Sequence, residues 1–279
     1  MASPLALRSV LFVPGANARA IEKARSLKQD ATIYDLEDSV ADTRHEEARA
    51  NVITALTQRT DDRPLIVRVS HPRTESGQDD LRTMVDKRPD AILLPKIDSA
   101  ETIIEVRRQF GVGTPLWAMI ETPLGILSSA SIAATIAESG GGALIVGPND
   151  IQRLSGLVSG PERVNFLPWL MQIALAAKAH GLSVLDGVYN DFGNDDGLVA
   201  EARQARDLGF DGKTLIHPRQ IDPCNAAFAP EPQEIAWAQM VVSAFADPAH
   251  VDANVVSVDG SMVERLHLEV AARILARSR

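Results

Sequence analysis

Cysteine is nearly missing from this chain of 279 residues, which contains only Cys224. One thiol forms neither an intramolecular disulfide bond nor a thiolate metal cluster. We therefore interpret Cys224 as a bystander and look for the chemistry of the protein among oxygen- and nitrogen-bearing side chains.

Long hydrophobic runs are missing as well. No segment approaches the ~20 apolar residues that a membrane-spanning helix needs. The first 15 residues, MASPLALRSVLFVPG, lack the long apolar stretch of a signal peptide, and Arg8 interrupts the stretch that is there. The sequence predicts a cytoplasmic protein without a membrane partner.

Positive charge is scarce, with 28 Lys and Arg residues against 37 Asp and Glu residues and a net charge of −9. A nucleic-acid surface would show basic stripes, so the balance argues against a nucleic-acid partner. A small anionic ligand stays possible, because a few Arg and Lys side chains can form a basic pocket inside an acidic protein.

Eight short apolar runs alternate with helix-length amphipathic segments. The runs cover residues 9–15, 31–38, 64–70, 91–96, 115–121, 143–150, 182–189 and 213–218. Nearly continuous apolar runs are typical of strands that are buried on both faces. Eight strand–helix units over this length predict a (β/α)8 TIM barrel, for which ~250 residues is typical. A doubly wound open sheet is the alternative, but no GxGxxG turn follows the first run.

The pattern changes near the C-terminus. We predict that residues 1–222 form the barrel and residues 223–279 a C-terminal extension. Residues 221–233 are proline-rich and indicate a connector, whereas residues 234–246 and 262–279 indicate two helices. We expect this extension to be too small for a core of its own and to pack on the barrel or on a neighbouring subunit.

Two acidic residues, Glu121 and Asp150, close two successive apolar runs. A carboxylate at the end of a buried strand is costly unless a metal ion, a cation or a set of donors accompanies it. Two of them on neighbouring strands indicate a hard divalent cation with oxygen ligands. The alternative is a pair of helix N-caps, which Asp150 and Thr122 are also able to provide.

Polar residues gather where the other runs end, at the edge where the loops of a barrel converge. Together the run ends contain Pro14, Glu37, Asp38, Arg68, Lys96, Glu121, Asp150, Asp186 and His217. The planar fork of Arg68 is suited to a carboxylate or a developing enolate. An ion pair with Glu37 or Asp38 explains Arg68 equally well, and a buried Lys–Asp pair or a satisfied histidine explains Lys96 and His217.

Several motifs then point to a family. RSVLFVPG, DLEDSV, the EEAR step, RVS, LLPK, IETPLG, GPNDI and GFDGKTLIHPRQI occur in this order along essentially the whole chain. In this the chain resembles the citrate lyase β-subunit-like proteins of the HpcH/HpaI aldolase superfamily. That group is similar to malyl-CoA and citramalyl-CoA lyases and the citrate lyase β subunit, which are Mg²⁺-dependent (β/α)8 barrels.

The resemblance implies roles for individual residues. Glu121 and Asp150 would be the protein ligands of Mg²⁺, and Arg68 would contact the substrate and stabilise a thioester enolate. Glu37 and Asp38 would support the waters of the metal and the basic residues around them.

Further contacts follow from the same resemblance. Pro14, Glu121 and Lys96 would border the substrate, with Lys96 acting electrostatically rather than as a covalent group. Arg19 and Lys23 are the candidates for contacts to the phosphates of coenzyme A.

The function that follows is that of a Mg²⁺-dependent carbon–carbon lyase. It would cleave or form a small 3-hydroxyacyl-CoA, such as citramalyl-, malyl- or citryl-CoA. One alternative is a metal-dependent aldolase acting on a free 4-hydroxy-2-oxo acid. Another is the β subunit of a citrate-lyase-type complex that acts on a carrier-bound acyl group. A non-catalytic paralogue is disfavoured because Arg68, Glu121 and Asp150 are all present.

Three positions depart from the family pattern. Ser70 and His71 stand where Asn is frequent, and His45 stands where Lys is frequent. Glu264 replaces an Asp that resembles a catalytic group supplied by a neighbouring subunit. The resemblance therefore predicts a homotrimer or hexamer, in which Glu264 is either the proton donor and acceptor or a solvated helix residue.

Overall fold

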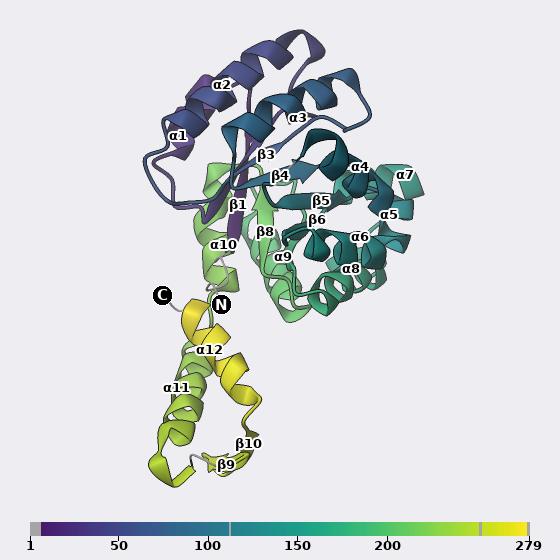
Figure 1. The fold of residues 1–279 in the computed structure, drawn as a ribbon. Coiled ribbons are helices and arrows are strands. Elements are labelled where there is room, and N and C mark those ends of the chain that lie inside the picture. Colours follow the sequence, from purple (N-terminus) through teal and green to yellow (C-terminus); the bar gives the residue numbers. More distant parts are fainter. Residues whose placement is uncertain (1–6, 112, 251–252, 278–279) are drawn as a thin grey trace. The chain divides into compact units, whose positions relative to one another are not determined.

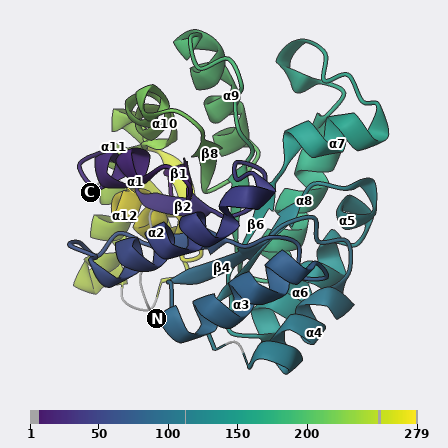
Figure 2. The same cartoon turned by 90° about the horizontal axis from the view of Figure 1, so that it is seen from above.

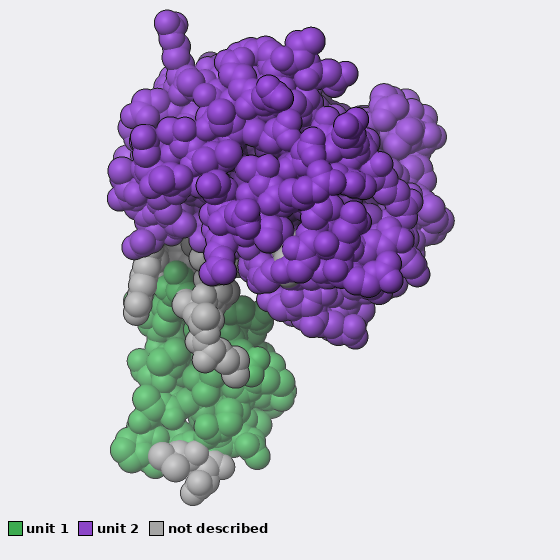
Figure 3. All heavy atoms as spheres, turned by 45° about the horizontal axis from the view of Figure 1, so that its top comes forward, with its two compact units in different colours: residues 1–6, 229–279 green, residues 7–228 purple. Residues whose placement is uncertain are grey.

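A computed structural model describes residues 7–111, 113–250 and 253–277 of the chain. These residues divide into two compact units, Leu7–Phe228 and the residues from Ala229 onward (Figure 3).

The first unit is a closed barrel of eight parallel strands (Figure 1). Each strand pairs with the next, and β1 closes the ring by pairing with β8. The strands are β1 Ser9–Pro14, β2 Ala31–Asp35, β3 Leu65–Arg68, β4 Ala91–Leu94, β5 Leu116–Ile120, β6 Ala143–Val146, β7 Ser183–Asp186 and β8 Gly212–Leu215. The predicted (β/α)8 TIM barrel is confirmed, and all eight apolar runs contain a strand.

Helices surround the barrel, as the view from above shows (Figure 2). They are α1 Ala18–Ala24, α2 His45–Thr57, α3 Glu75–Lys87, α4 Ala100–Phe110, α5 Pro123–Leu127, α6 Ser129–Glu138, α7 Pro148–Ser155, α8 Leu167–Ala179, α9 Asp195–Asp207 and α10 Ile221–Phe228. Short 3₁₀ turns lie at Asp42–Arg44, Pro161–Arg163 and Pro218–Gln220.

The strands are apolar throughout because both of their faces are buried. Alternate residues such as Ile33 and Leu93 fill the inside of the barrel. Their neighbours, such as Val67 and Leu94, pack outward against the helices. Polar side chains therefore collect at the strand ends, where the apolar layers stop.

The connector that the sequence predicts over residues 221–233 is wrong for its first part, which forms helix α10. Its buried face consists of Ile221, Cys224, Ala227 and Phe228, at helical spacing. Pro223 is compatible with a helix because it lies in the first turn, where its missing N–H removes no internal hydrogen bond. The compact barrel unit consequently extends to Phe228 instead of residue 222.

The C-terminal unit contains a β-hairpin between two helices. Helix α11 covers Pro232–Ala246 as predicted, followed by a 3₁₀ turn at Pro248–His250, strands β9 Val255–Val258 and β10 Ser261–Glu264, and helix α12 His267–Arg277. The helix predicted from residue 262 is wrong for its first turn. Asp259 and Gly260 both have positive φ (48° and 76°), as a tight hairpin turn requires.

This hairpin and the two helices enclose a small apolar cluster that includes Val241, Phe245, Val256 and Val263. The expectation that the extension lacks a core of its own is therefore also wrong. Across the described part of both units, no helix is long and apolar enough to span a membrane.

Candidate active site

A cavity of about 390 Å³ opens at the carboxyl ends of the barrel strands. Five residues that the sequence predicts for the site line it together, namely Pro14, Asp38, Arg68, Glu121 and Asp150. They come from the ends of β1, β2, β3 and β5 and from the start of α7. The barrel thus gathers side chains that lie up to 136 positions apart in the sequence.

Glu121 follows β5 and is almost fully buried. Its Oε1 accepts a hydrogen bond from the backbone N–H of Lys96 at 2.7 Å. Burial raises the pKa of Glu121 to about 8, and the nearby Glu37 carboxylate adds to the effect. Gly147 makes room for it, because a Cβ on that residue would lie 2.4 Å from the Cβ of Glu121.

Asp150 lies in the first turn of α7 and not at the end of a strand, since β6 already ends at Val146. The N-cap of α7 is Gly147, without a side-chain cap, so Asp150 is not a capping residue. Its Oδ1 accepts a hydrogen bond from Arg153 Nε at 3.1 Å. The capping alternative holds only for Thr122, whose side chain accepts from Gly125 N at the start of α5.

Arg68 ends β3 and is held by a carboxylate that the sequence analysis did not name. Its Nε and Nη2 donate to the two oxygens of Asp35 at 2.6 and 2.7 Å. The guanidinium also lies over the ring of Phe12, 5.0 Å from its centroid. Its Nη1 lies 3.3 Å from Asp38 Oδ2 and 3.2 Å from Glu37 Oε2. The ion-pair interpretation of Arg68 is thereby confirmed, with Asp35 as the principal partner.

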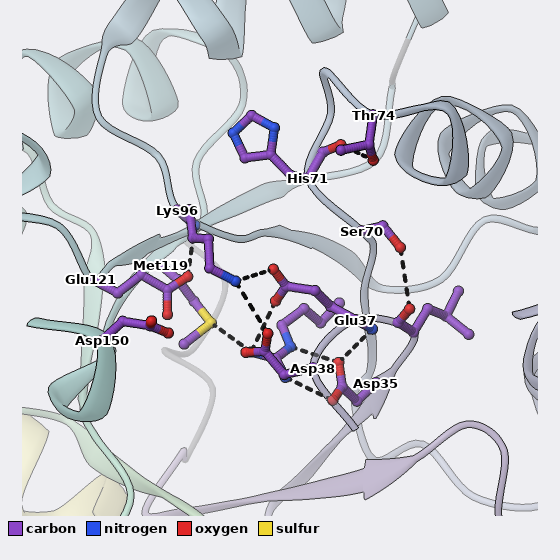
Figure 4. Close-up of polar contacts among 12 residues, drawn as sticks. Asp35, Glu37, Asp38, Ser70, His71, Thr74, Lys96, Met119, Glu121 and Asp150 are labelled. Atoms are coloured by element: carbon purple, nitrogen blue, oxygen red, sulfur yellow. Dashed lines mark hydrogen bonds and ion pairs between the residues drawn. The ribbon is translucent and has the colours of Figure 1, made fainter. Parts of the chain in front are cut away.

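Asp35 also organises the turn that carries Glu37 and Asp38 (Figure 4). Its two oxygens accept the backbone N–H groups of Glu37 and Ser39 at 3.0 and 3.1 Å. Burial alone would raise the pKa of Asp35, but the Arg68 guanidinium and the hydrogen bonds from Ser39 and Glu37 together lower it. The sequence contained a signal for this role, because Asp35 opens the DLED motif as the last residue of β2.

Lys96 lies against Glu37 and Asp38 (Figure 4). Its Nζ donates to Glu37 Oε1 at 2.5 Å and to Asp38 Oδ1 at 3.1 Å. Its φ of 51° is rare for a residue other than glycine and indicates local strain at the strand end. The alternative of a lysine paired with carboxylates therefore describes Lys96. Burial raises the pKa of Glu37 despite the cations beside it.

Ser70, which follows β3, contacts both Asp80 and the backbone of the DLED turn. Its Oγ lies 2.8 Å from Asp80 Oδ2 and 3.2 Å from the backbone oxygen of Leu36. Its N–H donates to the same Asp80 oxygen at 2.9 Å. Asp80 is fully buried, and burial raises its pKa. His45, the second departure from the family pattern, is buried at the start of α2.

The proposed phosphate contacts lie apart from the cavity. Arg19 and Lys23 are exposed on α1 and border a separate open groove, together with Arg25 and Thr60. Neither belongs to the lining of the main cavity. Glu264 ends strand β10 in the C-terminal unit, where its backbone N–H donates to His267 Nδ1 at 2.9 Å.

The contacts of Asp186 and His217 are with other side chains of the fold. Asp186 is buried between Lys213, whose Nζ lies 2.7 Å from Oδ2, and Arg163, whose Nη1 donates to both oxygens. The ring of His217 stacks on Phe192 with 4.9 Å between centroids, and its Nδ1 accepts from Arg219 N.

The donor chemistry of the cavity suits one kind of metal ion. Among the described residues, no three His, Cys, Asp or Glu side chains are placed to hold a metal together. The cavity offers the two carboxylates of Glu121 and Asp150. Mg²⁺ binds through one or two carboxylates and fills its other positions with water and substrate oxygens. The residues present therefore fit Mg²⁺ and do not fit a cage made entirely of protein ligands.

Fold and site together define a TIM barrel with an acidic cluster and one arginine at the carboxyl ends of its strands. The chain belongs to the HpcH/HpaI aldolase/citrate lyase family, whose model matches residues 8–218. It is 43% identical over 272 residues to the (3S)-malyl-CoA thioesterase of Cereibacter sphaeroides, covering 97% of this chain and 94% of that protein. It is 36% identical to the citrate lyase subunit beta of Escherichia coli, covering 97% and 93%.

A solved structure resembles the whole chain as well. Protein CitE from Mycobacterium tuberculosis, in complex with magnesium, acetoacetate and coenzyme A, superposes with a TM-score of 0.78 at 28% identity. The match covers 98% of each chain.

Proposed function

We propose that this protein is a Mg²⁺-dependent carbon–carbon lyase that cleaves or forms a small 3-hydroxyacyl-CoA, such as malyl-, citramalyl- or citryl-CoA. The observation that carries the proposal is the meeting of Glu121, Asp150 and Arg68 in one cavity. The magnesium and coenzyme A bound by the M. tuberculosis relative support it.

Glu121 and Asp150 would hold the metal, and Glu37 and Asp38 would support its waters. When bound, Mg²⁺ supplies Lewis-acid polarisation of the substrate's hydroxyl or carbonyl oxygen. Asp150 keeps an oxygen for this purpose, because the contact with Arg153 uses Oδ1 alone.

Arg68 would stabilise the negative charge of the thioester enolate. Asp35 holds the Nε and Nη2 edge of its guanidinium, so the group is already oriented before the substrate arrives. A fixed donor costs no reorganisation when charge develops. Pro14 borders the same space, and Lys96 acts through the carboxylates of Glu37 and Asp38.

The bonds change in a balanced sequence. The 3-hydroxyl loses its proton, and the hydroxyl carbon becomes the carbonyl carbon of an oxo acid. The carbon–carbon bond breaks at the same time, and its electron pair passes to the thioester fragment, which becomes an enolate. The enolate then takes up a proton at carbon. We assign the proton transfer to Glu264 of a neighbouring copy in a homotrimer or hexamer, and the coenzyme A phosphates to Arg19 and Lys23.

A substrate screen tests this function. Malyl-, citramalyl- and citryl-CoA are incubated with and without Mg²⁺, using the wild type and Glu121→Ala. We expect cleavage of at least one thioester by the wild type with Mg²⁺ only, and loss of both metal affinity and turnover in the variant. Glu138→Ala, which removes an exposed carboxylate on α6, is the matched control. Unchanged metal binding and turnover in Glu121→Ala would refute the proposal.

Thioester hydrolysis is a second candidate, because the relative at 43% identity is named a malyl-CoA thioesterase. The products separate the two functions. A lyase yields acetyl-CoA and glyoxylate from malyl-CoA, whereas a thioesterase yields malate and free coenzyme A. Cleavage of a free 4-hydroxy-2-oxo acid without coenzyme A would indicate the aldolase alternative, and activity only on a carrier-bound acyl group would indicate a citrate-lyase-type subunit.

A further inference from the structure

We propose that Ser70 and Asp80 position the DLED turn (residues 35–38) and thereby set the affinity of the proposed site for Mg²⁺. Neither is among the described residues that line the cavity, so both would act through the backbone of the turn and not on the substrate. The proposal rests on the proposed function, in which the carboxylates of the turn support the waters of the metal.

The peptide group between Leu36 and Glu37 is held on both sides. Its N–H, which belongs to Glu37, donates to Asp35 Oδ1 at 3.0 Å. Its carbonyl oxygen, which belongs to Leu36, lies 3.2 Å from Ser70 Oγ (Figure 4). The orientation of this peptide group determines where the side chains of Glu37 and Asp38 begin. Loss of the Ser70 contact would free one side of the peptide group from which the acidic pair continues.

Helix α3 holds Ser70 in place through Asp80. Oδ2 of Asp80 lies 2.8 Å from Ser70 Oγ and accepts the N–H of the same residue at 2.9 Å. The helix approaches this closely because Gly77 has no side chain. A Cβ on Gly77 would lie 2.6 Å from the backbone oxygen of Ser70 and 2.1 Å from that of His71. The contact between α3 and the segment after β3 thus fixes the direction of the Ser70 side chain.

Stability alone does not explain Asp80. The residue is fully buried, and its Oδ1 has no hydrogen-bond partner among the described residues. Arg49 Nε lies 3.6 Å from this oxygen, which is too far for a hydrogen bond. Burial raises the pKa of Asp80. Because a buried carboxyl group with an unsatisfied oxygen destabilises a fold, we attribute its presence to the position that it gives Ser70.

The Ser70 hydroxyl has one hydrogen for two acceptors. Asp80 Oδ2 is the closer of the two, and a carboxylate oxygen accepts more strongly than a peptide oxygen. The peptide oxygen of Leu36 therefore receives the weaker contact. An asparagine side chain has two amide hydrogens and is able to donate to both acceptors at once. Asparagine at position 70 should hold the turn at least as firmly as serine does.

Substitutions at Ser70 test this contact by calorimetric titration with Mg²⁺. Ser70→Ala should bind Mg²⁺ about tenfold more weakly, as for the loss of a hydrogen bond that orients the surroundings of a metal. Ser70→Asn should bind Mg²⁺ about as tightly as the wild type. Ser129→Ala, which removes the hydroxyl of a serine buried on α6, is the matched control. Unchanged Mg²⁺ affinity in Ser70→Ala overturns the proposal.

Substitutions at Asp80 test whether this residue acts through Ser70. Asp80→Asn keeps an oxygen that accepts from Ser70 and should retain Mg²⁺ affinity, whereas Asp80→Ala should lose about tenfold. The double variant Ser70→Ala/Asp80→Ala should bind Mg²⁺ no more weakly than Ser70→Ala does. Additive losses in the double variant would overturn the proposal, and the Ser70 variants decide it alone where Asp80→Ala does not fold.

The dependence of turnover on Mg²⁺ concentration separates positioning from a loss of folded protein. In Ser70→Ala the Mg²⁺ concentration for half-maximal turnover should rise about tenfold, while turnover at saturating Mg²⁺ stays near that of the wild type. A fall in turnover by one factor at every Mg²⁺ concentration would overturn the proposal.

Amide hydrogen exchange in the metal-free protein separates the positioning role from the proposed function. Residues 36–40 should exchange faster in Ser70→Ala than in the wild type or in Ser129→Ala. Faster exchange together with a wild type that binds no Mg²⁺ would refute the proposed function and still support positioning of the turn. Equal exchange together with intact Mg²⁺ binding would leave the lyase standing and overturn the positioning role.

Discussion

The ionisation of Glu121 affects the stability of the metal-free protein. Its pKa rises from a usual value of 4.5 to about 8 because the carboxyl group is buried. A pKa that is higher in the folded state means that the protonated form favours folding. The stabilisation from the protonated Glu121 carboxyl group is therefore fully present below about pH 4.5 and is lost as the pH rises through about 8.

We predict that Glu121→Gln, whose amide does not ionise, is more stable than the wild type at pH 9 without Mg²⁺. The difference should reach a few kcal/mol and disappear near pH 5. Urea unfolding with a chelator at both pH values measures it, with Glu138→Gln as the control. A stability difference that does not change with pH would contradict the raised pKa. Added Mg²⁺ should stabilise the wild type at pH 9 and not the variant.

The buried pair of Asp35 and Arg68 gives a second prediction at this scale. Asp35→Asn keeps the shape of the side chain but leaves the guanidinium without its two-bond partner. Removing one member of a buried pair typically costs 3–5 kcal/mol, so we expect a loss of roughly that size in the free energy of unfolding. Turnover should also fall, because the orientation of Arg68 depends on Asp35.

Asp79→Asn is the control for that experiment, since Asp79 forms an exposed pair with Arg82. Exposed pairs contribute about 1 kcal/mol or less. Equal effects of the two substitutions on urea unfolding would show that the Asp35–Arg68 pair has no special role.

At the scale of elements, the close passage of β6 and α7 over β5 depends on Gly147. A Cβ there would lie 2.4 Å from the Cβ of Glu121 and 2.6 Å from its Oε2. We predict that Gly147→Ala lowers Mg²⁺ affinity at least about tenfold, because the added methyl group displaces Glu121, which we propose as a metal ligand. Calorimetric titration measures the change. Gly113→Ala, which meets no atom within 4 Å, is the control and should bind Mg²⁺ normally.

The elements also show what local sequence patterns are able to predict. Every strand of the barrel was predictable, because strands buried on both faces give continuous apolar runs. Helix α10 was hidden by the proline at position 223, and the C-terminal hairpin by a helical apolar spacing in the segment from residue 262. In the first segment Pro223 lies in the first turn of a helix, where proline is tolerated. In the second, the positive φ values of Asp259 and Gly260 form a hairpin turn instead of a helix.

Residues that line the cavity were easier to predict than the contacts among them. The ends of buried strands can be predicted from apolar runs, so Arg68 and Glu121 were expected to lie near each other, and both line the cavity. The pairing of Arg68 with Asp35 was not predicted. It depends on the register between β2 and β3, which places Asp35 opposite Arg68. Asp150 was assigned to a strand end, but it lies in α7. The two elements are hard to separate in the sequence because α7 follows β6 after a single residue.

At the scale of the whole molecule, we have proposed that the proton transfer uses a carboxyl group from outside the barrel unit, that of Glu264. Glu264 belongs to the C-terminal unit, which encloses an apolar cluster of its own. If two copies share each site, Glu121→Ala and Glu264→Gln damage different halves of it. Either variant alone should be inactive, and the two together should complement each other.

We predict that co-expressed Glu121→Ala and Glu264→Gln subunits form mixed trimers with about a third of wild-type activity, because every closed ring of three that contains both subunits places an intact barrel beside an intact Glu264 at one of its three sites. Activity of the mixed oligomers purified on two different tags, together with their mass in solution, measures the effect. Mixing each variant with itself is the matched control. A fully active monomer, or mixed oligomers without restored activity, would show that Glu264 of a neighbour takes no part in the reaction.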